Sequence, residues 1–421
     1  MEIEISSFGT LFGLTMTVLL ILKKVNPAYA MMIGALTGGL VGGLSMVESV
    51  QVMVLGAEGM TGVVLRVLAA GVLAGVLIES GAAKRIAEDI LHKLGETKAL
   101  LAITGATMIL TGVGVFIGVA ILTVAPIALS IAKRANISKF AILLAISGGG
   151  KAGNIISPNP NTIAAAEAFK VPLTSVMLAG VLPALGGVLM TYFLSKRLVK
   201  RGSLVLDRDL PEQVANEKLP SLAAALSGPA VAIMLLLLQP LFGVNIDPMI
   251  ALPIGGIAGA IIMKKGRQLN TFATSGITKM TSVAILLLGT GTLAGIIAHS
   301  ALISVILQTV DALGIQPYWI APIAGVSMSA ATGSTAAATA VAGNVFAPTI
   351  IELGVNALAG AAMVHAGATV LDHLPHGTFF HITRGSVNME LKERFKLLPY
   401  ETVIGLGIVA LSTLIFGMLL Y

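Results

Sequence analysis

Long apolar runs separated by charged residues dominate the chain and predict membrane-spanning helices. A helix that crosses the bilayer needs about 20 apolar residues, and ten runs of this kind follow one another along the sequence. Because they do not alternate between polar and apolar positions, they indicate helices rather than the strands of an outer-membrane barrel. The predicted spans cover residues 8–22, 29–46, 63–78, 138–169, 173–194, 221–240, 248–263, 282–299, 355–381 and 402–420.

Two other apolar stretches, residues 99–132 and 318–351, have glycine-rich centres and no charge. Two full spans with a turn need about 40 residues, and each stretch is shorter than that. Their centres, residues 111–114 and 331–335, lack the charged residues of a surface loop. We therefore expect re-entrant hairpins whose tips border a cavity within the membrane. Ordinary helical hairpins with flexible turns are the alternative.

The polar, glycine and proline residues that interrupt the apolar runs recur in the same order after about 220 residues, which predicts an internal repeat. GVLAGVLIES at 71–80 corresponds to GTLAGIIAHS at 291–300, and each half has a span interrupted by glycine and proline, at 147–162 and 365–378. Five crossings per half is an odd number, so the halves must be inverted relative to each other. The predicted fold is thus an all-α polytopic membrane protein of two inverted repeats of five transmembrane helices, each with a re-entrant hairpin and a broken helix. The predicted units are residues 1–200, a cytoplasmic linker at 201–220, and residues 221–421.

Composition agrees with this pattern and excludes several classes of protein. The chain is 56% apolar and 11% charged, its mean hydropathy is +0.95, and it contains no Cys, whereas soluble domains carry about 25% charged residues. It contains no Walker sequence, HExxH motif or nucleophile elbow, so we expect neither an enzyme nor a cofactor.

The basic residues predict the orientation. With the crossings above, 23 of the 26 Lys and Arg lie on one side, which the positive-inside rule assigns to the cytoplasm. Both termini are then expected outside the inner membrane. Arg66 lies in the first turn of its span, where its side chain can reach the headgroups, and we expect no functional role for it.

The interrupted spans hold the candidate substrate-binding residues. A broken helix exposes amide N–H groups that attract a carboxylate, and neutral polar side chains suit a polyhydroxylated acid. Capping of the broken helices is the alternative role for these side chains. The candidates are Lys151, Asn154, Ser157, Asn159, Asn161 and Thr162 in the first half, and Thr332, Gly333, Ser334, Thr335, Gly377 and Thr378 in the second.

Ionisable residues within the spans are costly and therefore point to function. Lys151 is interpreted either as a cation that faces the substrate or replaces a coupling ion, or as a structural partner of Asp372 or Glu167. Asp372, His373 and His376 are the candidates for proton coupling, because imidazoles titrate near neutral pH. Hydrogen bonding to the broken backbone is the alternative for the histidines, and a metal site is not expected.

Four blocks of the sequence resemble the gluconate permease family of the ion transporter superfamily. They are GVLIESGAAKRIAEDI, VAPIALSIAKRANIS, NIISPNPNTIAAA and LDHLPHGTFFHITRGSVNMELKERFKLLPYETV. The resemblance implies proton-coupled symport of a small organic acid such as gluconate, an elevator-type mechanism and a homodimer. At Ser157–Thr162 and Pro375–Gly377 the sequence departs from the pattern of the family members that transport gluconate. The identity of the transported acid is therefore left open. A sodium/proton antiporter and a sodium-coupled carboxylate transporter are the alternatives.

Overall fold

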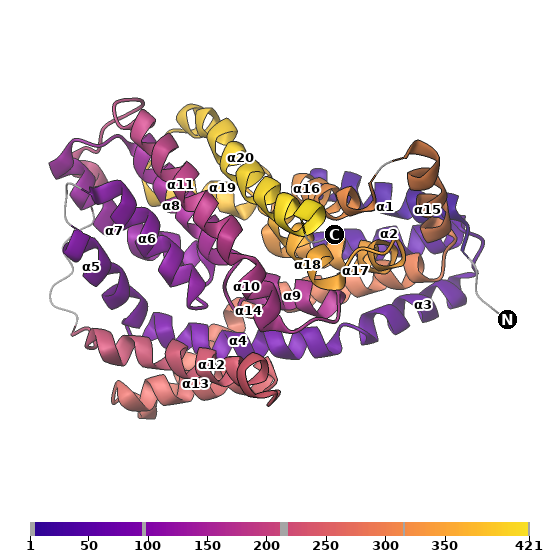
Figure 1. The fold of residues 1–421 in the computed structure, drawn as a ribbon, viewed down its shortest axis with the longest axis horizontal. Helices are drawn as coiled ribbons and strands as arrows, with labels where there is room; N and C mark the ends of the chain where they lie inside the picture. The colour runs from indigo at the N-terminus through magenta and orange to yellow at the C-terminus, as the bar shows by residue number, and fades with distance from the viewer. Residues whose placement is uncertain (1–4, 95–97, 211–217, 315, 420–421) are drawn as a thin grey trace.

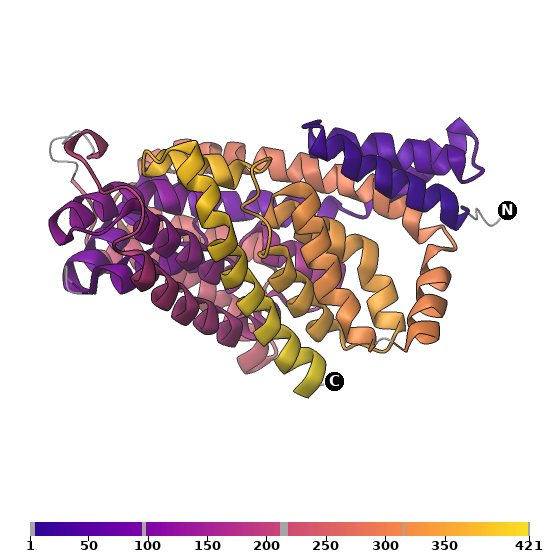
Figure 2. The same cartoon turned by 90° about the horizontal axis from the view of Figure 1, so that it is seen from above.

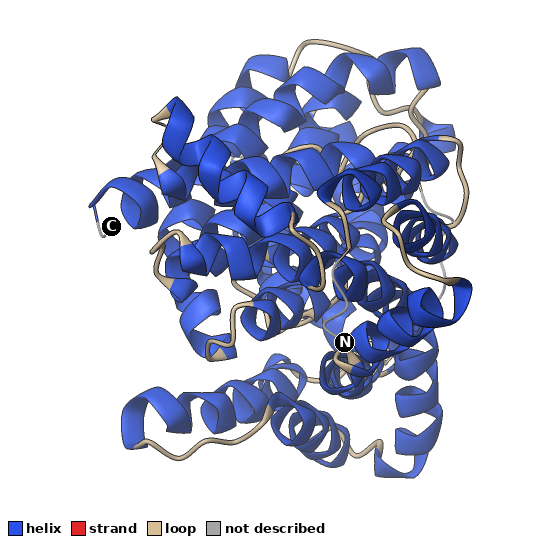
Figure 3. Ribbon diagram, turned by 90° about the vertical axis from the view of Figure 1, so that its right-hand side faces the viewer, coloured by secondary structure: helices blue, strands red, loops and turns tan. Residues whose placement is uncertain are grey.

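The described part of the chain is helical. The computed structural model describes residues 5–94, 98–210, 218–314 and 316–419, and Figure 3 shows helices and loops in this part, with no strand. Six of the helical segments described are long and apolar enough to cross a membrane, so the chain is a multi-pass membrane protein. They are Thr61–Glu79, Ile117–Ala135, Leu173–Leu198, Leu222–Phe242, Gly266–Ala298 and Leu391–Leu419.

The helices follow a corresponding order in both halves of the chain, although at two places a pair of helices in the first half corresponds to one longer helix in the second (Figure 1). The first half contains α1 (Ser7–Leu22), α2 (Pro27–Val41), α3 (Met46–Glu58), α4 (Thr61–Glu79), α5 (Ala82–Leu94), α6 (Ala99–Gly112), α7 (Ile117–Ala135), α8 (Lys139–Asn154), α9 (Pro160–Ala168), α10 (Leu173–Ala179) and α11 (Val181–Leu198). The second half contains α12 (Leu222–Phe242), α13 (Pro248–Ile262), α14 (Leu269–Ala298), α15 (Leu302–Leu313), α16 (Ile320–Thr332), α17 (Thr335–Glu352), α18 (Ala357–Ala368), α19 (Thr378–Ser386) and α20 (Leu391–Thr413), which continues into the π-helical turn η5 (Leu414–Leu419).

Helices α1–α4 and α12–α14 pack against one another and form a unit that we call the frame. Figure 1 shows α3 and α4 running one after the other along the length of the molecule, with α12 and α13 below α4. Glycines let α4 and α14 approach closely: a Cβ on Gly75 would lie 2.1 Å from the carbonyl oxygen of Phe272. Such contact between backbones is typical of tightly associated membrane helices.

Helices α6–α11 and α16–α20 form a second packed unit, the bundle, across which α20 runs diagonally (Figure 2). Helical hairpins are present at both expected places, as α6/α7 and α16/α17; that they are re-entrant stays a prediction, and α7 by itself is long enough to cross a membrane. The second turns at Gly333 and Ser334, as predicted, and Gly333 has φ +59°. The first turns at residues 113–116, slightly beyond the expected tip, with Gly114 at φ +102°.

Both predicted broken helices are also present. Pro160 occupies the first turn of α9, where its missing N–H costs nothing, and Asn159 caps that helix. Between α8 and α9 the chain leaves the helix at residues 155–159, and between α18 and α19 at residues 369–377. The breaks bring non-helical backbone to the middle of the bundle.

Some elements differ from the prediction. The expected spans at 63–78 and 282–299 are parts of longer helical segments, α3–α4 and α14. Helices α5 and α15, which connect the frame to the hairpins, are absent from the predicted spans. Helix α5 is amphipathic rather than apolar, and α15 has 12 residues, too few to cross the membrane. Residues 211–217 of the predicted linker lie outside the described residues.

Candidate functional site

The tips of both hairpins and both broken helices meet at one small cavity, which we call the inner cavity. Its volume is about 40 Å³, enough for one or two water molecules. This convergence of four segments was predicted from their sequence order. The cavity is lined by Phe116, Ile117, Gly118, Asn154, Asn161, Gly333, Ser334, Thr335, Ala336, Asp372, Thr378, Phe379 and Ile382.

The N-termini of four helices border the inner cavity. Helix α7 begins at Ile117, α9 at Pro160, α17 at Thr335 and α19 at Thr378, and each contributes a residue of its first turn to the lining. The first amides of a helix have no partner within the helix and carry partial positive charge. Four such ends around one cavity make its potential favourable for an anion.

Three asparagines of the first broken helix form a network beside the cavity. Asn159 Nδ2 donates to the backbone oxygen of Asn154 at 2.8 Å and to its Oδ1 at 2.6 Å, while Asn159 Oδ1 accepts from the amides of Asn161 and Thr162. Asn161 Nδ2 also donates to Asn154 Oδ1, at 3.0 Å. Because backbone groups have fixed donor and acceptor roles, these bonds determine the orientation of all three amides.

Two polar atoms of this network have no hydrogen-bond partner in the structure. They are Asn154 Nδ2, a donor, and Asn161 Oδ1, an acceptor, and both residues line the inner cavity. Buried polar groups without partners are rare and require a reason. A ligand hydroxyl, which can both donate and accept, would satisfy both atoms.

A buried charge pair lies at the opposite wall. Lys151 Nζ contacts Asp372 Oδ1 and the carbonyl oxygen of Thr369, and the Lys151 side chain is 0% exposed. Thr335 Oγ1 donates to Asp372 Oδ2 at 2.6 Å, so the second hairpin tip is bonded to the pair. The structure therefore favours Asp372 as the partner of Lys151; Glu167 bonds elsewhere.

His373 extends this charge pair toward α20. Its Nε2 lies 3.1 Å from the carbonyl oxygen of Leu398, which can only accept, so Nε2 carries the proton. Its Nδ1 lies 3.3 Å from Lys151 Nζ and 3.5 Å from Asp372 Oδ1. His381 Nε2 donates in the same way to the carbonyl oxygen of Pro375. Both contacts fit the alternative in which imidazoles stabilise the broken backbone.

The predicted site residues divide into two groups. Seven of them line the inner cavity: Asn154, Asn161, Gly333, Ser334, Thr335, Asp372 and Thr378. The others are not among its lining residues: Lys151, Ser157, Asn159, Thr162, Thr332, Gly377, His373 and His376. Of these, Asn159 caps α9 and Thr332 bonds back to the carbonyl oxygen of Met328, as the capping alternative expected.

A second buried ion pair was not predicted. Arg394, which the charge pattern assigned to a cytoplasmic loop, is 0% exposed and pairs with Glu401 at 2.5 Å and 3.2 Å. Ser147 donates to Glu401 at 2.5 Å, and the Arg394 guanidinium lies over the ring of Phe380. The seven-residue spacing of Arg394 and Glu401 on one face of α20 is the sequence signal that could have indicated the pair.

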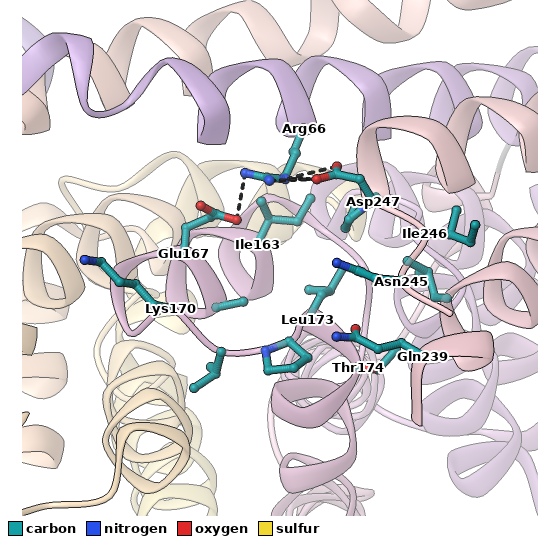
Figure 4. A pocket seen from close by; sticks show the side chains of 15 residues that line it. Arg66, Ile163, Glu167, Lys170, Leu173, Thr174, Gln239, Asn245, Ile246 and Asp247 are labelled. Atoms are coloured by element: carbon teal, nitrogen blue, oxygen red, sulfur yellow. Dashed lines mark hydrogen bonds and ion pairs between the residues drawn. The ribbon is translucent and has the colours of Figure 1, made fainter. Parts of the chain in front are cut away.

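Arg66 also differs from the expectation, because it pairs with protein rather than with headgroups. Its Nε and Nη2 bond Asp247, at 3.1 Å and 2.7 Å, and its Nη1 lies 2.7 Å from Glu167 Oε1. These residues lie on one wall of a pocket of about 270 Å³, the outer pocket, between α4, α9, α10, α12 and α13 (Figure 4). Its other polar lining residues are Lys170, Thr174, Gln239 and Asn245.

The multi-span fold, with its polar cavity inside the bundle, defines a membrane transporter. A family model described as "GntP family permease" matches residues 6–419. The chain therefore belongs to the GntP family of permeases, the gluconate permease family that its motifs resemble, which consists of transporters rather than enzymes.

Relatives and a solved structure agree. An uncharacterized transporter of Haemophilus influenzae is 59% identical over 98% of both chains. A high-affinity gluconate transporter of Escherichia coli K12 is 23% identical over 96% of this chain and 98% of its own. The crystal structure of the Alcanivorax borkumensis YdaH transporter matches with a TM-score of 0.58 at 16% identity, covering 85% of each chain. This last likeness concerns the fold alone.

Proposed function

We propose that this permease imports a small hydroxylated carboxylate, of the gluconate type, together with protons. The observation that carries the proposal is the inner cavity, where four helix N-termini surround unpartnered amide atoms and a buried Lys–Asp pair. The helix ends and Lys151 attract the carboxylate, while Asn154 and Asn161 bond the hydroxyls. The gluconate transporter among the relatives supports this class of substrate.

Charge balance supplies the coupling. With Lys151 paired to Asp372 the pair is neutral, and a carboxylate brought beside it alone would leave a net negative charge buried. A proton on Asp372 alone would leave the Lys151 ammonium without a counter-charge. Because an unbalanced buried charge costs several kcal/mol, the proton and the anion stabilise each other's binding. We therefore propose one proton per carboxylate and electroneutral transport.

The transport movement that we propose is of the elevator type. The matching helix order in the two halves supports two inverted repeats, residues 1–200 and 221–421, which contribute one hairpin and one broken helix each. The frame, with its close glycine contacts, is the stationary part, and the bundle carries the site across the membrane. The inner cavity then opens to each side in turn, with basic loops in the cytoplasm, both termini outside the inner membrane, and the frames of two copies forming a homodimer.

Uptake by proteoliposomes tests this function. Labelled gluconate should accumulate under an inward proton gradient and should be insensitive to membrane potential at constant pH difference. Sorbitol, which has the hydroxyls without the carboxylate, is the matched control and should not enter.

Accumulation of gluconate under an inward sodium gradient alone would show that sodium, and not the proton, is the coupling ion. Proton flux driven by sodium in the absence of any acid would instead favour the antiporter. Gluconate uptake that ignores both gradients would disprove coupling.

A further inference from the structure

The outer pocket is the larger of the two polar hollows described above. Its volume of about 270 Å³ compares with about 40 Å³ for the inner cavity. Small-molecule sites are typically a few hundred Å³, so in this conformation the outer pocket has room for a small organic acid and the inner cavity does not. Figure 4 shows polar side chains facing this hollow from several elements.

Arg66 binds its two carboxylates in different ways. Asp247 receives bonds from both Nε and Nη2, and it also accepts the amide of Met249 as the N-cap of α13. Glu167 has a single contact with Nη1 at 2.7 Å, and its side chain is 36% exposed. Arg66 and Asp247 therefore form a fixed unit, whereas Glu167 is the carboxylate that another anion can replace.

The contact between Arg66 and Glu167 joins the two units of the molecule. Arg66 lies on α4 of the frame, and Glu167 lies on the last turn of α9 in the bundle. The first turn of α9 carries Asn161, a lining residue of the inner cavity, and six residues of helix separate the two by about 9 Å. One short helix thus contacts both the outer pocket and the inner cavity.

We propose that the outer pocket is a second carboxylate-binding site of this transporter, in which the substrate's carboxylate displaces Glu167 from Arg66. A guanidinium is suited to carboxylates because its N–H groups match their geometry. The hydroxyls of the acid would bond Gln239 and Thr174. Displacement of Glu167 removes an ion pair between α9 and the frame, so occupation of the outer pocket weakens one of the contacts that hold the bundle against the frame. The inference rests on the proposed function, since the ligand is the same acid.

Thiol labelling measures occupation of the outer pocket without transport. The chain contains no Cys, so Asn245→Cys places a single thiol at an exposed position in the lining. In detergent, gluconate should slow its reaction with maleimide, whereas sorbitol should not. Gln268→Cys, an exposed position elsewhere on the frame, is the control and should react at the same rate with and without gluconate.

The same measurement with Asn154→Ala and Asn161→Ala added separates the two sites. Protection of Asn245→Cys that persists in this background supports a separate outer site. Protection that disappears shows that gluconate acts only through the inner cavity and overturns the inference. Absence of protection in a protein that still transports gluconate overturns it as well, while the proposed function stands. Protection without transport would support the outer site and refute the proposed function.

Kinetics of two variants provide a second test. Glu167→Gln retains the size of the side chain but removes the competing charge, so the KM for gluconate should fall by about two- to fivefold. Arg66→Lys retains the charge but loses the paired N–H groups of the guanidinium that bind a carboxylate, and the KM should rise by about tenfold. Glu352→Gln, an exposed residue at the end of α17, is the matched control and should leave the KM unchanged. A purely structural contact would shift both variants in the same direction, and that result would contradict the inference.

Discussion

The buried pair of Lys151 and Asp372 has an energetic cost for folding and also a proposed role in transport. Neither side chain contacts solvent appreciably, and removing both charges from water is expensive. The pair persists because Thr369, Thr335 and His373 supply further hydrogen bonds. Its neutrality is what makes the binding of an anion depend on a proton.

Lys151→Ala should therefore destabilise the protein by about 3–5 kcal/mol, because it leaves the Asp372 carboxylate buried without a cation. Adding Asp372→Asn removes that charge and should restore most of the loss. Thermal unfolding in detergent measures both. Lys93→Ala, which removes an exposed lysine from an i,i+4 pair with Asp89, should change little. Equal losses in the single and double variants would show that the pair contributes no charge effect.

The asparagines of the first broken helix have different roles, although they look equivalent in the sequence. Asn159→Ala removes the cap of α9 and should cost about 1 kcal/mol in stability. Asn154→Ala removes a lining amide and should abolish stabilisation by gluconate. Thermal unfolding with and without gluconate separates the two effects. Retained gluconate stabilisation in Asn154→Ala would mean that the hydroxyls bind elsewhere.

At the level of elements, the close approach of the second hairpin to the second broken helix shapes the inner cavity. Gly333 and Gly377 lie backbone to backbone: a Cβ on Gly333 would be 2.9 Å from the Cα of Gly377. Gly333 also adopts a left-handed conformation that L side chains avoid. Only a residue without a side chain lets Ser334 and Thr335 begin α17 at the cavity.

Gly333→Ala should consequently lower both stability and gluconate uptake, since the added methyl group strains the backbone and separates the two segments. Gly385→Ala is the matched control: it lies within α19 with nothing within 4 Å of its Cβ, and alanine there should stabilise the helix by up to about 1 kcal/mol. Unfolding and uptake of both variants are compared. Wild-type uptake by Gly333→Ala would show that the contact is dispensable.

At the level of the whole molecule, the connection between the halves is anchored to the bundle by a buried ion pair. Asp209 Oδ2 lies 2.8 Å from Lys139 Nζ at the start of α8, and both side chains are buried. Burial by itself raises the pKa of Asp209, but hydrogen bonds from Lys139 and the amide of Leu206 outweigh it and hold the pKa below its ordinary value.

This lowered pKa predicts a pH-dependent contribution to stability. Because the carboxylate is more acidic in the folded state, its stabilisation is complete above about pH 4, the ordinary pKa of Asp, and is lost as the pH falls through the folded value. Asp209→Asn should thus be less stable than the wild type at pH 7, and the difference should shrink below pH 4. Asp207→Asn, at an exposed position two residues away, serves as control. A difference that stays constant with pH would contradict this account.

The sequence alone determined much of this architecture. The length of an apolar run predicts a membrane-spanning helix, because the backbone N–H and C=O groups of a chain in lipid find hydrogen-bond partners only within a helix. Glycine and proline predict where helices break, and the repeated order of these signals predicted that four segments would converge. Seven of the predicted site residues, including Asn154, Asn161 and Asp372, line the inner cavity for that reason.

Only the tertiary structure decided which polar residues face the cavity and which charges are paired. Arg394 reads as a loop cation, although the spacing of Glu401 on the same helix indicates a partner. Arg66 reads as a headgroup anchor in the sequence, because its partners are too distant along the chain to be recognised. Their partners lie 7 and up to 181 residues away, and Lys151 pairs across 221 residues. Side-chain burial and pairing are properties of packed helices, so they follow from the way the two halves close around the cavity.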